Sequence, residues 1–456
     1  MTISTLEAIS PLDGRYREKI KRLANYFSEH ALIKYRVKVE IRWFESLCNE
    51  KKIHETPTLS DIQKRKLNSI IENFSLSDSR KIKLIEKKTN HDVKAVEYWL
   101  QDRIKKIPGL EKYTQFIHFA CTSEDINNCA HSLMLKESRD KEVMPIIDKL
   151  IAELTKLAKK NAHVAMASRT HGQLASPTTL GKEIANFVYR LREHQKTIKN
   201  VYLSAKANGA VGNFNAHLIA YPKVNWQSLS KKFISNLGLK PIAYTTQIEP
   251  HDSMAELFDG YKRFNSTLLD LNKDFWSYIS LGYFGQKLVT NEVGSSTMPH
   301  KINPIDFENS EGNLGIANSL FTHLSQKLLV SRLQRDLSDS TALRNNGAVL
   351  GYSILAYLST LNGIKKVKPN YAIIKADLAD RWELLSEPIQ TTMKRYGAKN
   401  AYEILKNLTR GNSKISEKQI HKLINGLSIP KDEKNRLLNL NPESYIGFSE
   451  RLAKKI

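Results

Sequence analysis

The sequence has 456 residues, of which 41% are apolar and 26% are charged, and its formal net charge is +23. These values exclude a wholly disordered chain, and the length allows more than one structural unit around a large core. No apolar run approaches the length of a membrane span, and the N-terminal sequence lacks the basic start and apolar centre of a signal peptide, so neither is expected.

The cysteines indicate a compartment. The sequence has three cysteines, Cys48, Cys121 and Cys129, which is an odd number, and no two of them form a CxxC motif. Such usage is typical of a reducing environment, and it argues against both a disulfide scaffold and a cysteine zinc site. We therefore expect a cytoplasmic protein.

The positive charge has two interpretations, an anionic partner such as nucleic acid or a lysine-rich solvated surface. The lysines are scattered over the whole chain, and no RNA-binding motif or zinc-finger spacing accompanies them. This favours the surface, with a minor part of the charge serving an anionic ligand. No nucleic-acid partner is expected.

Helical patterns dominate the chain from its N-terminal part onward. Amphipathic helices are predicted at 17–50 and 92–107. A longer one is predicted from Thr122, where TSED places an acid three residues after a hydroxyl cap, to about residue 162. Pro177 and Pro304 are predicted to open helices to about residues 208 and 330.

The clearest helical pattern runs from Asp252 to about residue 289. Its apolar residues form two seven-residue series offset by three, namely Met254, Tyr261, Leu268 and Phe275, and Leu257, Phe264, Leu271 and Tyr278. About 38 helical residues span roughly 57 Å, whereas a compact sphere of this chain has a radius of gyration of about 22 Å. We expect an elongated bundle in which this seam packs on other helices, including those of other subunits.

One more helix is predicted at about 341–364, and shorter helices follow Pro369. Together these patterns predict an all-α fold of three helical domains. They are an N-terminal domain (1–111), a central long-helix bundle (112–365) and a small C-terminal domain (366–456).

The breaks between helices share a polar composition. They are SPLDGRY (10–16), KTNHD (88–92), ACTSED (120–125), SRTHGQLASP (168–177), YTTQIEPHD (244–252), GSSTMPHKINP (294–304) and SRLQRDLSDSTALRN (331–345). Long helices place such connections at the ends of a bundle, where loops carry chemistry. Metal-ligand spacings, a P-loop and a nucleophile elbow are absent from the sequence. The hydroxyls, imidazoles, amides and cations suit acid–base chemistry on an anionic substrate, with no cofactor and no metal.

Single residues in these loops allow plainer interpretations. A loop histidine is more often a structural hydrogen-bonding group than a catalyst, and a Ser-Ser-Thr run is usually a turn or a cap. Thr122 and Ser123 stand at a predicted helix N-terminus, where free N–H groups favour an anion.

Four of the segments resemble a known family. GSSTMPHKINP resembles the signature GSSxMPxKxNP of the fumarase/aspartase superfamily. NHDVKAVEY (90–98), SRTHGQ (168–173) and TTQIEPHD (245–252) are similar to segments of the bacterial adenylosuccinate lyase family within it. The likeness runs from SPLDGRY to TRGNS (409–413), nearly the whole chain. Leu174 departs from it, because the family is expected to have proline after HGQ.

The resemblance implies a homotetramer whose central helices form a twenty-helix core, with each active site assembled from three subunits. It also implies two reactions of purine nucleotide biosynthesis. In one, adenylosuccinate is cleaved to AMP and fumarate. In the other, the succinylated aminoimidazole carboxamide ribotide (SAICAR) is cleaved to the carboxamide (AICAR) and fumarate.

The resemblance also implies roles for individual residues. Ser295 is expected to be the general base and His171 the general acid of a β-elimination. The expected substrate-binding residues are Arg15, Tyr16, Asn90, His91, Asp92, Thr122, Ser123, Gln247, Lys301, Ile302, Asn303, Asn309, Arg335, Ser340, Thr341, Ala342, Leu343 and Arg344. Within this set, Lys301 and Asn303 are expected to hold the succinyl carboxylates, and the N-terminal and 331–344 cations the phosphate.

Two alternatives stay open at this point. One is another fumarate-releasing lyase of the superfamily, such as argininosuccinate lyase or a fumarase, against which the purine-type segments argue. The other is a non-catalytic helical scaffold or nucleic-acid binder, which would fit the charge of +23. The joint presence of His171, Ser295, Lys301 and Asn303 argues against a silent scaffold.

Overall fold

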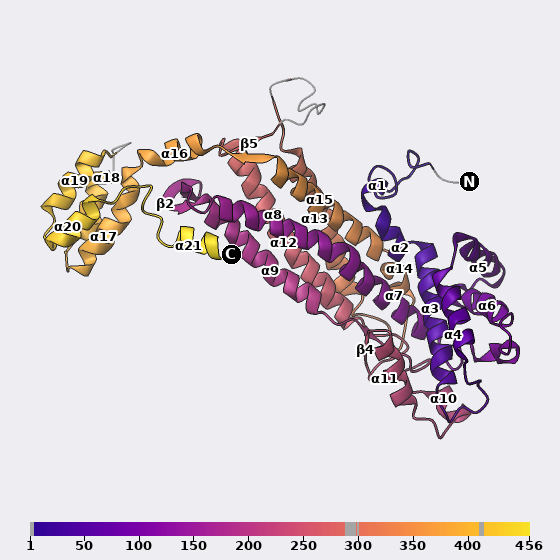
Figure 1. Ribbon diagram of the computed structural model, residues 1–456. Helices are drawn as coiled ribbons and strands as arrows, with labels where there is room; N and C mark the ends of the chain where they lie inside the picture. The colour runs from indigo at the N-terminus through magenta and orange to yellow at the C-terminus, as the bar shows by residue number, and fades with distance from the viewer. Residues whose placement is uncertain (1–3, 288–297, 299–300, 410–414) are drawn as a thin grey trace. The chain divides into compact units, whose positions relative to one another are not determined.

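The structure is a computed structural model, and it describes residues 4–287, 298, 301–409 and 415–456 (Figure 1). Within these residues helices make up nearly all regular structure, and the few strands form two-stranded pairs. This confirms the expected all-α class. The chain divides into two compact units, unit 1 with residues 1–147, 194–266 and 312–356, and unit 2 with residues 148–193, 267–311 and 357–456. The division into three helical domains stays a prediction.

The N-terminal part of unit 1 is a cluster of helices around an apolar core. Its helices are α1 (Arg17–Ile20), α2 (Ala24–Phe27), α3 (Glu29–Cys48), α4 (Asp61–Glu72), α5 (Leu76–Thr89) and α6 (Asp92–Ile104). The predicted helix 17–50 is interrupted, because Ser28 adopts an extended conformation and caps α3 by accepting from the N–H of Ala31. The sequence analysis did not predict α4 and α5, which serine capping boxes begin at Ser60 and Ser75.

The predicted helix 122–162 has a wide turn in its middle. The structure has α7 (Ser123–Ser138), a π-helical turn (Arg139–Val143) and α8 (Met144–Lys160). Pro145 lacks an N–H, and its ring would clash with the carbonyl of Lys141 in a regular helix, which the wider turn relieves. The same turn directs the buried Arg139 to the carbonyl oxygens of Ile198 and Val201, the latter at 2.6 Å.

Pro177 does not open a helix, contrary to the prediction. It lies in β2 (Gln173–Thr179), which pairs antiparallel with β1 (Ala165–Thr170), and the pairing is irregular beside it. Helix α9 (Leu180–Asn200) begins three residues later. Gly181 packs closely on the end of α8, since a Cβ there would lie 2.4 Å from the carbonyl oxygen of Ala158.

Helix α12 (Asp252–Ser280) carries the predicted seam. Its seam residues Met254, Leu257, Tyr261, Phe264, Leu268, Leu271 and Phe275 are at most 1% exposed, which confirms the pattern, whereas Tyr278 is only half-buried. The helix ends nine residues earlier than the predicted 289. Gly282, at φ +74°, turns the chain into β5 (Phe284–Gln286), which pairs with β6 (Val367–Pro369).

Three buried polar side chains join three long helices inside unit 2. Asn272 of α12 donates to Ser310 of α13 (Ile305–Lys327) at 2.9 Å, and Ser310 lies 2.8 Å from Thr360 of α15 (Asn346–Lys366). Thr360 donates back to Asn272 at 2.9 Å. This polar triangle satisfies every member, so it costs little although the side chains are at most 1% exposed.

The remaining elements are short. In unit 1 they are β3 (Ser204–Ala205), α10 (Asn215–Ala220), α11 (Trp226–Asn236), β4 (Lys240–Pro241) and α14 (Ser338–Leu343). In unit 2 they are α16 (Tyr371–Ala379), α17 (Ser386–Arg395), α18 (Ala401–Thr409), α19 (Glu417–Gly426), α20 (Lys431–Leu438) and α21 (Ser449–Lys455). Helices α17 to α20, which are orange and yellow in Figure 1, surround their own apolar core.

One helical stretch of the described residues, Ser338–Lys366, is long and apolar enough to pass a test for a membrane span, with a mean hydropathy of 1.2. Of the residues in that window, 72% are buried inside the protein. Such burial is typical of a core helix.

Candidate active site

The N-terminus of α7 is held by a buried ion pair. Asp125 accepts from the N–H of Thr122 at 2.8 Å, which confirms the predicted capping box. The second oxygen of Asp125 lies 3.1 Å from Nζ of Lys206, and both side chains are at most 1% exposed. Asp125 also accepts from the N–H groups of Asn208 and Gly209. The glycine-rich segment is thereby fixed against the helix end, while Thr122 and Ser123 stay partly exposed.

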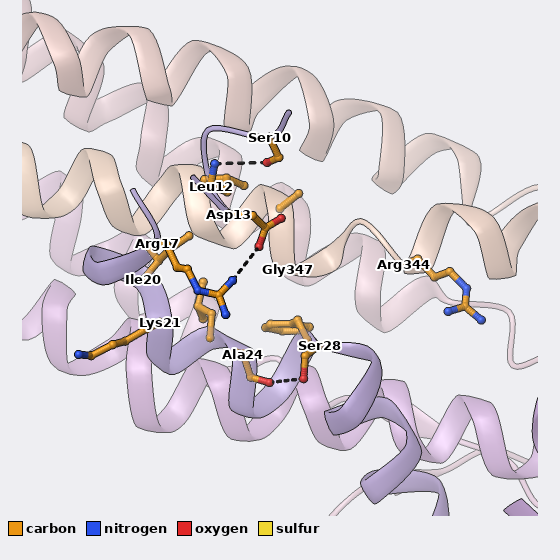
Figure 2. Close-up of a pocket in the computed structure, with 13 residues that line it drawn as sticks. Ser10, Leu12, Asp13, Arg17, Ile20, Lys21, Ala24, Ser28, Arg344 and Gly347 are labelled. Atoms are coloured by element: carbon orange, nitrogen blue, oxygen red, sulfur yellow. Dashed lines mark hydrogen bonds and ion pairs between the residues drawn. The ribbon is translucent and has the colours of Figure 1, made fainter. Parts of the chain in front are cut away.

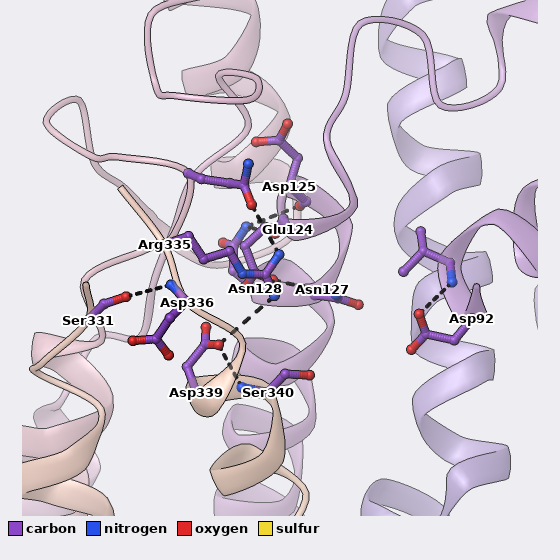
Figure 3. A network of polar contacts seen from close by, with 12 residues as sticks. Asp92, Glu124, Asp125, Asn127, Asn128, Ser331, Arg335, Asp336, Asp339 and Ser340 are labelled. Carbon is purple, nitrogen blue, oxygen red and sulfur yellow. Dashed lines mark hydrogen bonds and ion pairs between the residues drawn. The ribbon is translucent and has the colours of Figure 1, made fainter. Parts of the chain in front are cut away.

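Arg335 connects two predicted site segments of unit 1. Its Nη1 donates to Oε1 of Gln247 at 3.2 Å, and its Nη2 lies 3.2 Å from Oε2 of Glu124. Figure 3 shows Arg335 between Glu124 and Asp339, and Ser340 beside Asp339. Burial raises the pKa of Glu124 to about 7, although Arg335 acts to lower it. The structure thus brings Arg335, Gln247 and the start of α7 together.

A second buried charge cluster adjoins Arg335. His251 lies with Nδ1 3.3 Å from Glu249 and Nε2 3.7 Å from Asp339, and all three side chains are at most 3% exposed. Burial alone would lower the pKa of His251, but Asp339 and Glu249 raise it to about 9. In the described part of the chain, no group of three His, Cys, Asp or Glu side chains is arranged to hold a metal ion.

Arg344 and Asp92 form another pair. Nη2 of Arg344 lies 3.5 Å from Asp92, and its Nη1 donates to Glu29 at 2.8 Å. Asp92 also pairs with the buried Arg36 at 2.7 Å. Burial opposes the ionisation of Asp92, but Arg36 and Arg344 hold its pKa below the ordinary value.

The neighbours of Asp92 have structural duties as well. Asn90 ends α5 in the left-handed conformation, and Nδ1 of His91 accepts from the N–H of Lys94 as the N-cap of α6. An acceptor at Nδ1 places the ring proton on Nε2, so the exposed His91 presents an N–H to solvent.

The N-terminal segment lines a pocket of about 320 Å³ that includes Arg344 (Figure 2). Asp13 and Arg17 line it from one side, and Gly347 and Ala348 from α15. The predicted Arg15 and Tyr16 lie between Asp13 and Arg17 in the chain, and the Arg15 guanidinium is 5.8 Å from the Tyr16 ring centre. Of the three predicted residues before Arg344, Thr341 is exposed, whereas Ala342 and Leu343 are buried.

In unit 2, His171 stands at the tip of the β1–β2 hairpin. His171 and Gly172 have φ of +52° and +73°, as a two-residue hairpin turn requires. The imidazole is exposed, and within the described residues it has no hydrogen-bond partner. Arg169 anchors the hairpin by donating to Asp377 at 2.5 Å and to Tyr283 at 2.7 Å. His171 is therefore an exposed residue on a fixed support.

The segment before α13 is described only in part. Ser295, the predicted base, lies outside the described residues. The exposed Lys301 donates its backbone N–H to Met298 at 3.0 Å, and the carbonyl of Ile302 accepts from Gln286 at 2.8 Å. Asn303 and Asn309 are half-buried beside and within the start of α13.

The described candidates thus form two sets. Unit 1 holds Arg15, Tyr16, Asn90, His91, Asp92, Thr122, Ser123, Gln247, Arg335, Ser340, Thr341, Ala342, Leu343 and Arg344, and unit 2 holds His171, Lys301, Ile302, Asn303 and Asn309.

The sequence analysis missed the buried ionisable side chains that hold these residues. They are Arg36, Glu124, Lys206, Glu249, His251 and Asp339. A signal was present for Arg36, because Leu32, Ile33 and Val39 stand at helical spacing from it and a charge on such an apolar face needs a partner.

The chain was compared with known proteins. A family model described as lyase matches residues 14–317, and one described as adenylosuccinate lyase C-terminal matches residues 331–446. Adenylosuccinate lyases from Vibrio cholerae and Legionella pneumophila are 52% and 53% identical to the whole chain, over 100% and 99% of their own lengths. The one from Escherichia coli is 50% identical over 98% of both chains.

Solved structures agree on the fold. A fumarate lyase from Mesorhizobium superposes with a TM-score of 0.75 at 15% identity, over 96% of this chain and 97% of that one. A β-carboxy-cis,cis-muconate cycloisomerase from Acinetobacter calcoaceticus gives 0.70 at 16% identity, over 96% and 99%. At such identities the likeness concerns the fold alone.

Proposed function

The chain belongs to the adenylosuccinate lyase family, and we propose that it releases fumarate from adenylosuccinate to leave AMP, and from SAICAR to leave AICAR. The observation that carries the proposal is the identity of about half of all residues with adenylosuccinate lyases over the full length of both chains. Small anionic molecules are therefore the substrates.

The reaction is a β-elimination across a C–N bond. A base removes a proton from the carbon beside a carboxylate, and the resulting aci-carboxylate carries two negative charges. The amine leaves with its electron pair and must be protonated. The site consequently needs a base, an acid and fixed positive charge near the carboxylate.

His171 fits the acid. An imidazole titrates near neutral pH and can donate a proton to the leaving nitrogen. Its exposed position at the tip of an anchored hairpin supports this role, because the ring is free to meet a substrate while its backbone is fixed. Ser295 is the proposed base. Serine is a weak base in water, so Lys301 and neighbouring N–H groups would have to stabilise its alkoxide in a site closed to water.

The remaining candidates fit the charges of the substrate. The phosphate and one carboxylate would be bound by Arg335, Arg344, Thr122, Ser123 and Ser340. The phosphate would also contact Arg15 and Tyr16. Lys301 and Asn303 would hold the succinyl carboxylates, and Gln247 the succinyl group near the scissile bond. The contact between Arg335 and Gln247 supports placing these two residues in one site.

We further propose a cytoplasmic homotetramer whose long helices form a twenty-helix core, with sites shared between subunits. The full-length likeness to the family supports this assembly.

The decisive experiment measures fumarate release by absorbance with adenylosuccinate, SAICAR and argininosuccinate. We expect turnover of the first two only, and turnover of argininosuccinate alone would contradict the proposal. Ser295→Ala should abolish turnover while calorimetry still detects substrate binding. A near-normal kcat for Ser295→Ala would remove Ser295 from the role of base.

A further inference from the structure

We propose that the buried His251 is a positioning residue, which holds the 247–251 loop against the 335–340 segment so that Arg335 and Ser340 meet the phosphate-bearing half of the substrate. The inference deepens the proposed function and rests on it. His251 itself would not touch the substrate, since it is 0% exposed.

His251 is the middle member of a line of three buried ionisable groups. Its backbone N–H donates to Oε2 of Glu249 at 3.0 Å, and its ring Nδ1 lies 3.3 Å from the same oxygen. On the other side, Nε2 lies 3.7 Å from Oδ2 of Asp339. His251 adopts φ +63° immediately before α12, a conformation that a non-glycine residue keeps only when its surroundings fix it.

Asp339 also contacts two residues of the candidate site, Ser340 and Arg335. Its second oxygen accepts from the N–H of Ser340 at 2.7 Å and lies 4.0 Å from Nη2 of Arg335. Arg335 in turn donates to Gln247, two residues before Glu249. The two segments are therefore joined through the side chains of Arg335 and Gln247, and through the backbone N–H of Gln247, which donates to the carbonyl of Gln334 at 3.3 Å. The ring of His251 joins them once more, through Asp339.

The charge of the imidazole is essential to the connection through His251. Glu249 and Asp339 are both excluded from water, and Glu124 lies on the far side of Arg335. Without a cation between them, two buried carboxylates repel each other and lose their hydration. A neutral side chain at 251 would therefore favour separation of the two segments, and Arg335 and Ser340 would move with them.

The test compares His251→Gln with the wild-type enzyme. We expect the KM for adenylosuccinate and the Kd for AMP to rise at least about tenfold, because loss of the buried cation leaves two carboxylates without their charged partner and lets Arg335 move. The kcat should change less than about threefold, because the proposed acid and base, His171 and Ser295, lie outside the two joined segments. The double variant Glu249→Gln/His251→Gln should recover part of the AMP affinity, since it removes an unpaired carboxylate.

The matched control is His217→Gln. His217 is equally buried in unit 1 but packs among the rings of Trp43 and Trp226, and burial lowers its pKa to about 4, so it is neutral. This variant should lose stability while AMP binding stays near the wild-type value. If His251→Gln does not fold, Glu249→Gln gives the same comparison, because it removes one partner of the imidazole.

Unchanged AMP affinity in His251→Gln, or a kcat that falls as much as the AMP affinity, would overturn the positioning role. Equal effects of the two histidine variants would do so as well. A wild-type enzyme that releases no fumarate would instead contradict the proposed function, so the two failures are distinguishable.

Discussion

Arg335 donates to Gln247 with one nitrogen at 3.2 Å and lies with the other 3.2 Å from the buried carboxylate of Glu124. An arginine proposed to bind a substrate anion is therefore already oriented by two protein groups. Its planar fork allows this, because it presents several N–H donors in fixed directions. A lysine at the same place offers one charged point and cannot contact both partners in the same way.

Arg335→Lys should consequently raise the KM for adenylosuccinate at least about tenfold, equivalent to about 1.4 kcal/mol of binding free energy. Steady-state fumarate release measures it. Arg332→Lys is the control, since Arg332 lies on the same segment with its side chain 83% exposed and pairs only with Asp336 among the described residues. Equal KM values for the two variants would contradict a binding role for Arg335.

His171→Ala should lower kcat by at least about 100-fold, the usual contribution of a general acid. The folded state should change little, because the imidazole is exposed at a hairpin tip. The thermal midpoint checks the folding, and fumarate release checks the kcat.

Mixing the His171→Ala and Ser295→Ala variants should restore part of the activity if each site takes these residues from different subunits. The mixture must first exchange subunits, which native mass spectrometry of differently tagged chains verifies. No recovery after verified exchange would count against shared sites.

The pH dependence of stability should carry the signature of His251. Its pKa of about 9 lies above the ordinary 6.5, so its contribution to the free energy of unfolding is complete below about pH 6.5 and is lost as the pH rises through 9. Burial raises the pKa of Glu124 to about 7, so that its effect falls between about pH 4.5 and 7. Burial also raises the pKa values of the three cysteine thiols, so they add a decrease in the same range. Urea unfolding of wild type and His251→Gln between pH 7.5 and 9.5 separates the two, and the variant should show the smaller decrease.

Thr360→Val should destabilise the protein by about 1–3 kcal/mol, because Oδ1 of Asn272 and the hydroxyl of Ser310 each lose one buried hydrogen bond. Thr360→Ser keeps the hydroxyl and loses one methyl group, so its cost should be about 1 kcal/mol. Chemical denaturation compares the two. A valine variant as stable as the serine variant would show that the hydroxyl contributes no net stability.

The seam of α12 could be predicted from sequence because periodicity alone determines which face a long helix buries. Met254, Leu257 and Tyr261 confirm it with exposures of 0%. The position of Pro177 could not be predicted, since a proline suits both a helix start and an irregular strand, and the pairing with Ala167 decides between them. The short helices α4 and α5 went unnoticed because each depends on a local capping box.

The candidate site shows a similar limit. Composition and resemblance predicted that Gln247 and Arg335 belong to one site, but not their contact, which joins positions 88 residues apart. The pair of Asp92 and Arg344 is separated by 252 residues. Buried groups such as Lys206 and His251 were missed because a charge in a polar loop looks exposed until packing encloses it.

The polar triangle of Asn272, Ser310 and Thr360 has a consequence for accuracy of placement. Apolar seams tolerate sliding of one helix along another, whereas three mutual hydrogen bonds permit a single axial register. Helix α13 begins at Ile305, directly after Asn303 and Pro304, so its register sets where Asn303 stands. A slip of one helical turn would displace that amide by about 5.4 Å, while a hydrogen bond tolerates only a few tenths of an ångström. The buried hydrogen bonds in the interior of the bundle thereby fix the position of Asn303 at its end.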